Sequence, residues 1–85
     1  MIYLREKCIL ELANWKKSDI KIYQKIQKLI SAIETSPLSG IGKPEPLKHA
    51  LSGLWSRRID RKNRIVYAID GNDIFIISCK GHYEQ

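Results

Sequence analysis

The spacing of apolar residues changes at Ser36-Pro37, and this change limits the folds open to the chain. Upstream, apolar side chains recur at steps of three and four, the repeat of an amphipathic helix; they are Ile22, Ile26, Leu29, Ile30 and Ile33. Downstream, short segments rich in β-branched and aromatic residues alternate with turn-forming residues, which is typical of strands. The pattern predicts helices in the N-terminal half and a sheet in the C-terminal half.

Two helices are predicted before this break. The first covers about residues 6–17, where one apolar face is formed by Cys8, Leu12 and Trp15. The second starts after Ser18 or Asp19, since either side chain can accept a hydrogen bond from the first turn, and the proline ends it. Residues 1–4 precede both helices as a candidate short strand.

The C-terminal half predicts three strands after an ordered loop. Residues 37–53 hold all three prolines, which fix φ and lack a backbone donor, so we expect a loop with a short turn near residues 47–50. Asp70-Gly71-Asn72-Asp73 predicts a hairpin turn. The strands are expected over residues 54–60, 64–69 and 74–80. The expected fold is α+β, an antiparallel sheet with two helices packed on one face.

Chain length limits the number of domains, and net charge limits the kinds of partner. Eighty-five residues form one domain, residues 1–85, because a second could not bury its own core. Fifteen Lys and Arg against nine Asp and Glu give a net charge of +6, which favours nucleic acid, an anionic membrane face or an acidic protein. No apolar run approaches the ~18 residues of a spanning helix and no signal peptide is visible, so we expect a cytoplasmic protein with no membrane partner.

The two cysteines, Cys8 and Cys79, lie in a predicted helix and a predicted strand, outside any CxxC motif. In the expected compartment, buried reduced thiols are favoured over a disulfide or a reactive thiol. Together with His49 and His82 they match no zinc-ligand spacing. We therefore expect no metal and no other cofactor.

The stretch from residue 40 to residue 67, together with the chain end, carries the side chains from which an RNA-cleaving site could be built. Metal-free cleavage can use the 2′-hydroxyl beside the scissile phosphate as the nucleophile. It then needs a base, an acid and cations for the charge on phosphorus. Glu45, between two prolines, is the candidate base, and His82 is the candidate acid because imidazole can carry a proton at neutral pH.

The remaining candidates would hold the RNA. The arginine fork matches two phosphate oxygens at once, and our choices are Arg58 and Arg64. Lys48 would add a positive charge and Tyr83 could stack on a base.

The turn that follows residue 60 decides whether the two arginines share a face. If Arg61-Lys62-Asn63 is a three-residue loop with Asn63 in the left-handed conformation, Arg58 and Arg64 project from the same side of the sheet. A four-residue loop would place them on opposite sides. The shared cationic site therefore depends on this turn.

Each of these residues also has a simpler structural interpretation. Glu45 could be an exposed loop residue, and His82 a solvated residue near the chain end. Arg57 and Arg58 are commonly the solvent-facing side of a hairpin. The two tryptophans fit the core or a partner contact better than base stacking. From the residues alone, the chain is a small basic domain that binds nucleic acid, with cleavage left open.

A longer pattern resembles a known family. GKPEPLK followed by LSG, then WSRRI, a short loop and RIVY, and a terminal HY are similar to motifs of the Txe/YoeB toxins. These are small RelE-like endoribonucleases of bacterial type II toxin–antitoxin systems. The similarity runs from about Asp19 to Tyr83 and is most specific in residues 40–67. It implies a microbial RNase (RelE-like) fold, with two N-terminal helices on a twisted antiparallel sheet.

The resemblance also implies a reaction and a role for each matching residue. The expected activity is that of a metal-independent endoribonuclease that cuts mRNA in the ribosomal A site, inhibits translation and leaves a 2′,3′-cyclic or 3′-phosphate and a 5′-hydroxyl. Glu45 in KPEP matches the general base, and His82 in HY the general acid. Arg64 matches the phosphate-binding arginine. The matching substrate-binding positions are Lys48, Arg58 and Tyr83.

Among the departures from the family pattern, two concern the ends of predicted elements and of the candidate site. Arg5 stands where relatives tend to have a Ser or Thr helix cap. Gly81 stands before His82 where a bulkier residue is expected, so this point of the chain is expected to be more flexible and to hold the histidine less firmly.

The partners implied are mRNA on the ribosome and a YefM-like antitoxin whose acidic C-terminal segment folds over the toxin, which the positive charge of this chain fits. Operator DNA is expected only through the antitoxin complex, and homodimerisation stays open. Two alternatives also stay open: a toxin homologue that binds RNA or the ribosome without cutting, and an RNase that needs no ribosome. A carboxylate beside phosphate argues against the first, because like charges repel.

Overall fold

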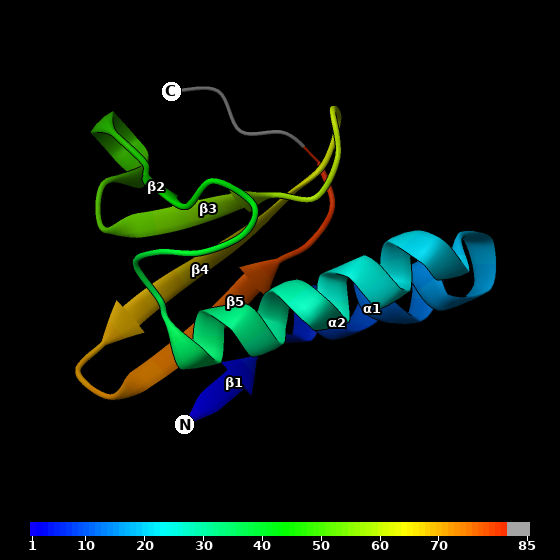
Figure 1. Cartoon of the computed structure of the whole chain (residues 1–85), viewed down its shortest axis with the longest axis horizontal. Coiled ribbons are helices and arrows are strands. Elements are labelled where there is room, and N and C mark those ends of the chain that lie inside the picture. The colour runs from blue at the N-terminus through cyan, green and yellow to red at the C-terminus, as the bar shows by residue number, and fades with distance from the viewer. Residues whose placement is uncertain (82–85) are drawn as a thin grey trace.

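The computed structural model describes residues 1–81. Its elements are β1 (Ile2–Leu4), α1 (Glu6–Ser18), α2 (Ile20–Thr35), β2 (Glu45–Pro46), the short 3-10 helix η1 (His49–Leu51), β3 (Leu54–Arg58), β4 (Arg64–Asp70) and β5 (Asp73–Ser78). The five strands form one sheet in the order β1-β5-β4-β3-β2, and the two helices lie together against one side of it (Figure 1). No helix in this part of the chain is long and apolar enough to cross a membrane.

Both predicted helices are confirmed, with ends within about two residues of those expected. The Asp19 carboxylate accepts a hydrogen bond from the Ile22 N–H at 3.2 Å and so caps α2. The three-and-four spacing of α2 buries Ile26, Leu29 and Ile33 completely. Arg5 makes no side-chain cap at the start of α1, in keeping with the missing Ser or Thr.

The core lies between the helices and the face of the sheet that they cover. Its fully buried members include Ile65, Tyr67 and Ile76 from the sheet, against which α1 and α2 pack. Cys8 and Cys79 are buried within it, and their Sγ atoms lie 3.9 Å apart, so the predicted buried free thiols are confirmed. Both tryptophans pack against this core, as expected.

The sheet differs from the prediction at its two edges. At one edge β1 pairs with β5 in parallel, with Ile2 opposite Ile74. The helices and three further strands separate these two strands in the chain, and a connection of that length permits parallel pairing. At the other edge, the predicted loop contains the two-residue strand β2, which pairs with β3. The other three strands are antiparallel, as expected.

The turn between β3 and β4 gives the predicted outcome by a different geometry. Arg58 pairs directly with Arg64, so the two arginines share a face of the sheet, as predicted. The connection is five residues long, and its odd length preserves the parity of a three-residue loop. The predicted left-handed Asn63 is wrong, because Asn63 has no positive φ. Instead the Asp60 carboxylate accepts hydrogen bonds from the N–H groups of Lys62 at 2.8 Å and Asn63 at 2.7 Å.

Arg57 is buried, which corrects the interpretation that it lies on the solvent-facing side of a hairpin. Its guanidinium donates hydrogen bonds to four acceptors. These are the Tyr67 hydroxyl at 3.2 Å and the backbone carbonyls of Ile41 at 3.1 Å, Ser39 at 2.9 Å and Ser36. Because the carbonyls belong to the loop after α2 and Arg57 to β3, the side chain holds that loop against the sheet.

The same loop is pressed closely between α2 and β3 at Gly42. Its φ of +84° lies in the region that favours glycine, and its carbonyl accepts a hydrogen bond from the Arg58 N–H at 2.6 Å. A Cβ added there would lie 2.9 Å from Leu29 Cδ2 and 3.1 Å from Arg57 Cβ. The chain can therefore enter β2 along this path only because residue 42 has no side chain.

We expect Arg57→Ala to lower the free energy of unfolding by at least about 3 kcal/mol, because each buried acceptor left without a donor costs roughly 1–3 kcal/mol. Arg58→Ala is the matched control, since the neighbouring arginine has an exposed side chain and its backbone bond survives. Urea denaturation measures both. Equal losses in the two variants would contradict the anchoring role of Arg57.

A pH effect is expected from Asp60. Burial alone would raise its pKa, but hydrogen bonds from the Lys62 and Asn63 backbone outweigh burial and hold the pKa below the ordinary value. A lowered folded-state pKa contributes stability above the unfolded pKa, near 3.9, and this contribution is lost as the pH falls through that range. The melting-temperature difference between wild type and Asp60→Asn should therefore shrink from pH 7 to pH 3. A difference that stays constant would refute this.

Candidate active site

Glu45 is placed by the short strand β2. Its two neighbouring prolines lack the N–H that an interior strand needs, which suits an edge strand that pairs on one side only. Glu45 lies opposite Ser56 of β3 in this pairing. Just beyond β2, Leu47 is buried and donates its N–H to the Leu54 carbonyl at 2.8 Å, which fixes the end of the segment.

The strand registers place three predicted site residues on one face of the sheet. Arg58 lies two residues beyond Ser56 on β3 and therefore points to the same side as Glu45, and Arg64 pairs with Arg58 across β4. The intervening residues Arg57 and Ile65 point to the other side and are buried there. Glu45, Arg58 and Arg64 thus project from the face that the helices leave uncovered.

Glu45 and Arg64 form an ion pair. Glu45 Oε1 lies 3.6 Å from Arg64 Nη1, and the side chains are 51% and 29% exposed. This distance is longer than the roughly 2.7–2.9 Å of a tight charge-assisted hydrogen bond. Pairs this open to solvent contribute only ~0–1 kcal/mol, so an incoming anion can separate them at little cost.

Gly81, the last described residue, is held beside Arg64 by backbone contacts. The Arg64 N–H donates to the Gly81 carbonyl at 2.9 Å, and the Gly81 N–H donates to Asn63 Oδ1 at 2.9 Å. Gly81 has a φ of +95°, in the region that favours glycine, and both of its backbone groups are hydrogen-bonded. The expectation that it holds His82 less firmly stays a prediction. The candidate acid His82 and the candidate stacking residue Tyr83 lie outside the described residues.

Two side chains of α1 hold the backbone of Cys79, which follows β5, and so fix the direction in which the chain leaves the sheet toward Gly81. The Cys79 N–H donates to Glu11 Oε1 at 2.8 Å, and the Cys79 carbonyl accepts from Trp15 Nε1 at 3.0 Å. Trp15 therefore has a structural role in addition to its core packing.

Lys48 does not lie on the strands that carry the other three residues. It lies beyond β2, at the N-cap of η1, and its side chain is exposed. The structure therefore brings Glu45, Arg58 and Arg64 together and leaves Lys48 on the loop next to them.

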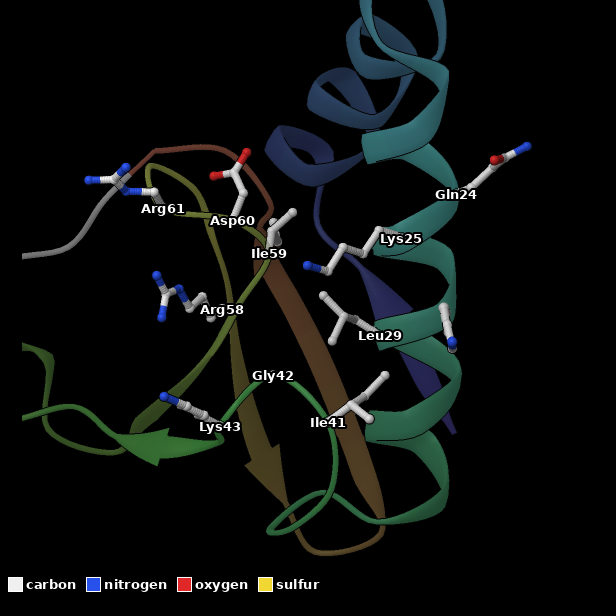
Figure 2. A pocket seen from close by; sticks show the side chains of 11 residues that line it. Gln24, Lys25, Leu29, Ile41, Gly42, Lys43, Arg58, Ile59, Asp60 and Arg61 are labelled. Atoms are coloured by element: carbon white, nitrogen blue, oxygen red, sulfur yellow. The ribbon is translucent and has the colours of Figure 1, made fainter.

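Sequence reasoning missed a groove that begins at Arg58. It has a volume of about 830 Å³ and lies between α2, the loop at residues 41–43 and the segment of residues 58–61 (Figure 2). Its cationic lining residues are Lys25, Lys28, Lys43, Arg58 and Arg61. The step of three between Lys25 and Lys28 on a predicted helix was a signal for a shared face, but nothing in the sequence showed what lies opposite that face.

The arrangement combines a partly exposed carboxylate with arginines that can bind an anion. Within residues 1–81, no group of three or more His, Cys, Asp or Glu side chains gathers to hold a metal. A carboxylate can accept a proton from a hydroxyl, and the arginines can hold a phosphate next to it.

Comparisons with known proteins identify similar toxins. Toxin YoeB of Synechocystis sp. is 51% identical over 71 residues, which cover 84% of this chain and 83% of that protein. The solved structure of a heterotetrameric YoeB-YefM toxin–antitoxin complex from Staphylococcus aureus contains a chain that superposes with a TM-score of 0.87 at 40% identity, covering 98% of this chain and 97% of that one.

A second solved structure, the YoeB dimer from Staphylococcus aureus, gives a TM-score of 0.87 at 41% identity and covers 96% of this chain and 95% of that one. The predicted α+β, RelE-like fold class is thereby confirmed. The family model for the YoeB-like toxin of bacterial type II toxin–antitoxin systems matches residues 5–83. This chain therefore belongs to the family of YoeB-like toxins.

Proposed function

We propose that this toxin is a ribosome-dependent endoribonuclease that cuts mRNA in the A site and so inhibits translation. The observation that carries the proposal is the Glu45–Arg64 pair at 3.6 Å, with Arg58 directly opposite Arg64 on the same open face. A proton acceptor and two phosphate-binding side chains thus lie together where a single-stranded RNA can reach them.

The proposed reaction begins when a phosphate enters between Glu45 and Arg64. The arginine turns to the phosphate oxygens, and the carboxylate is released to face the adjacent 2′-hydroxyl. Glu45 takes the proton of this hydroxyl as its oxygen attacks phosphorus. Arg58 and Arg64 stabilise the added negative charge on the phosphate oxygens in the transition state.

The bond from phosphorus to the 5′-oxygen then breaks, leaving a 2′,3′-cyclic phosphate and a 5′-hydroxyl. The leaving oxygen needs a proton, and His82 is the residue proposed to supply it, on the strength of the sequence pattern and the position of Gly81 beside Arg64. Lys48 and Tyr83 are proposed to bind the RNA. No step in this scheme calls for a metal or another cofactor.

The ribosome is proposed to supply what this small site lacks. Glu45 is half exposed, so the protein alone does not enclose the reacting atoms. Alignment of the 2′-oxygen with the scissile bond accounts for a large part of catalysis in such reactions. An mRNA held in the A site would arrive with that alignment restricted, which supports a requirement for the ribosome and a cytoplasmic location.

The proposed protein partners follow from the similar structures, which are a YoeB-YefM complex and a YoeB dimer. We propose a YefM-like antitoxin with an acidic segment for this chain, because its net charge is +6. Homodimerisation is proposed because one of these similar structures is a YoeB dimer. Contact with operator DNA is proposed only as part of the antitoxin complex.

Replacing the proposed base tests the chemistry. We expect Glu45→Gln to slow cleavage of ribosome-bound mRNA by at least ~100-fold, because general base catalysis contributes about 10²–10⁴-fold. Glu34→Gln on the exposed surface of α2 is the matched control and should cut at the wild-type rate. Primer extension measures the rate, with circular dichroism as the check on folding. A folded Glu45→Gln variant that cuts at the wild-type rate would exclude the base role.

The nucleophile and the ribosome requirement are tested with one set of mRNAs. A 2′-deoxy substitution at the cut site should abolish cleavage but leave binding largely intact, because the attacking hydroxyl is missing. Cuts should appear in the A-site codon only when ribosomes are present. Cleavage of naked mRNA would contradict ribosome dependence, and translation inhibited without any cut would favour a binding module.

A further inference from the structure

The groove beside the active site is unused by the proposed reaction. One wall is α2, and the other is the end of β3 with the turn that follows it (Figure 2). Leu29 and Ile59, both buried, and Ile41 supply its apolar surface. Figure 2 shows Lys25 reaching from α2 toward this surface.

The charge of the groove is strongly one-sided. Five cationic residues line it against one acidic residue, Asp60, which leaves an excess of four positive charges. The Asp60 carboxylate is already occupied by the N–H groups of Lys62 and Asn63. The two lysines of α2 that line the groove, Lys25 and Lys28, are exposed and stand within one turn of each other. The groove therefore favours an extended anion with several charges over a single small one.

The groove borders the candidate active site at Arg58. Arg58 lines the groove and also lies opposite Arg64 on the sheet face that carries Glu45. Lys43 lines the groove two residues before Glu45 in the chain. In Figure 2 the side chains of Arg58 and Lys43 point in the same direction, away from α2. A polyanion with one phosphate at Arg64 would therefore have to pass from the uncovered face of the sheet over Arg58 and Lys43 to reach Lys25 and Lys28.

We propose that this groove binds the single-stranded RNA that flanks the cut site, through its phosphates. The inference rests on the proposed function, since it assigns a path to the same substrate. No aromatic side chain is among the described residues that line the groove, so bases have no stacking platform there. Binding in the groove is therefore to the backbone and independent of base sequence.

The test uses fluorescence anisotropy with RNAs that carry a 2′-deoxy nucleotide at the cut site and stay uncut. One is a trinucleotide that fills only the active site, and the other extends it to about a dozen nucleotides, a length in the range that single-strand grooves cover. The groove variant is Lys25→Ala with Lys28→Ala. Its matched control is Lys7→Ala with Lys17→Ala, two exposed lysines of α1 that do not line the groove. Alanine favours the helix in all four positions.

We expect the groove variant to bind the long RNA about 10-fold more weakly and the trinucleotide as wild type does. The slope of log K against log salt should fall by about 1.4, since each phosphate contact on a single strand contributes ~0.7. The control should keep wild-type affinity and slope. Equal losses in both double variants would show diffuse attraction and overturn the proposal. Wild-type affinity of the groove variant for the long RNA would also overturn it, as would the absence of measurable binding of the long RNA to the wild-type protein.

A poly-glutamate peptide serves as the competing probe. If the groove variant loses affinity for this peptide and keeps its affinity for the long RNA, the groove is a site for an acidic protein segment and the proposal fails. Because the RNAs are never cut, the result is separate from catalysis. A chain that binds long RNA through the groove but never cleaves ribosome-bound mRNA would refute the proposed function and leave the groove assignment standing.

Discussion

The hydrogen bonds of the buried Arg57 guanidinium are the interaction on which the candidate active site depends. It joins β3 to the backbone of the loop that follows α2, through hydrogen bonds to three carbonyls. The Tyr67 hydroxyl accepts a fourth bond and donates to the Pro37 carbonyl at 2.7 Å, which ties the start of that loop to β4. The segment that carries Glu45 is thus positioned from inside the protein, although Glu45 itself is half exposed.

The strand registers then place the side chains of the candidate site on one face of the anchored sheet. Glu45 lies opposite Ser56, and Arg58 lies opposite Arg64, so a carboxylate and two guanidinium groups share the face that the helices leave open. The weak Glu45–Arg64 pair keeps the two groups close, and little free energy is needed to separate them when another ion binds. We propose that the basic groove beside Arg58 gives the same site a path for a longer RNA, so that the chemistry and the charge of the chain serve one substrate.

The sequence predicted what is local and missed what is set by distant contacts. The cap at Asp19, the spacing of α2 and the hairpin at residues 70–73 follow from neighbouring residues, and all were predicted. Arg57 reads as a surface arginine because its acceptors are carbonyls some 16–21 residues away, which leave no side-chain pattern. The parallel β1 and the groove likewise depend on which elements meet in space. The roles proposed for the site residues, which residue types alone left open, come from the likeness to YoeB toxins.

The central claim is that Glu45 and Arg64 act as one unit in cleavage, and a double-mutant cycle tests it most directly. Single-turnover cleavage of ribosome-bound mRNA would be measured for wild type, Glu45→Gln, Arg64→Ala and the double variant. Residues that work as a unit are strongly non-additive, so the account predicts a double variant only slightly slower than the slower single variant. Rate losses that multiply would show that the two side chains act independently and would contradict it.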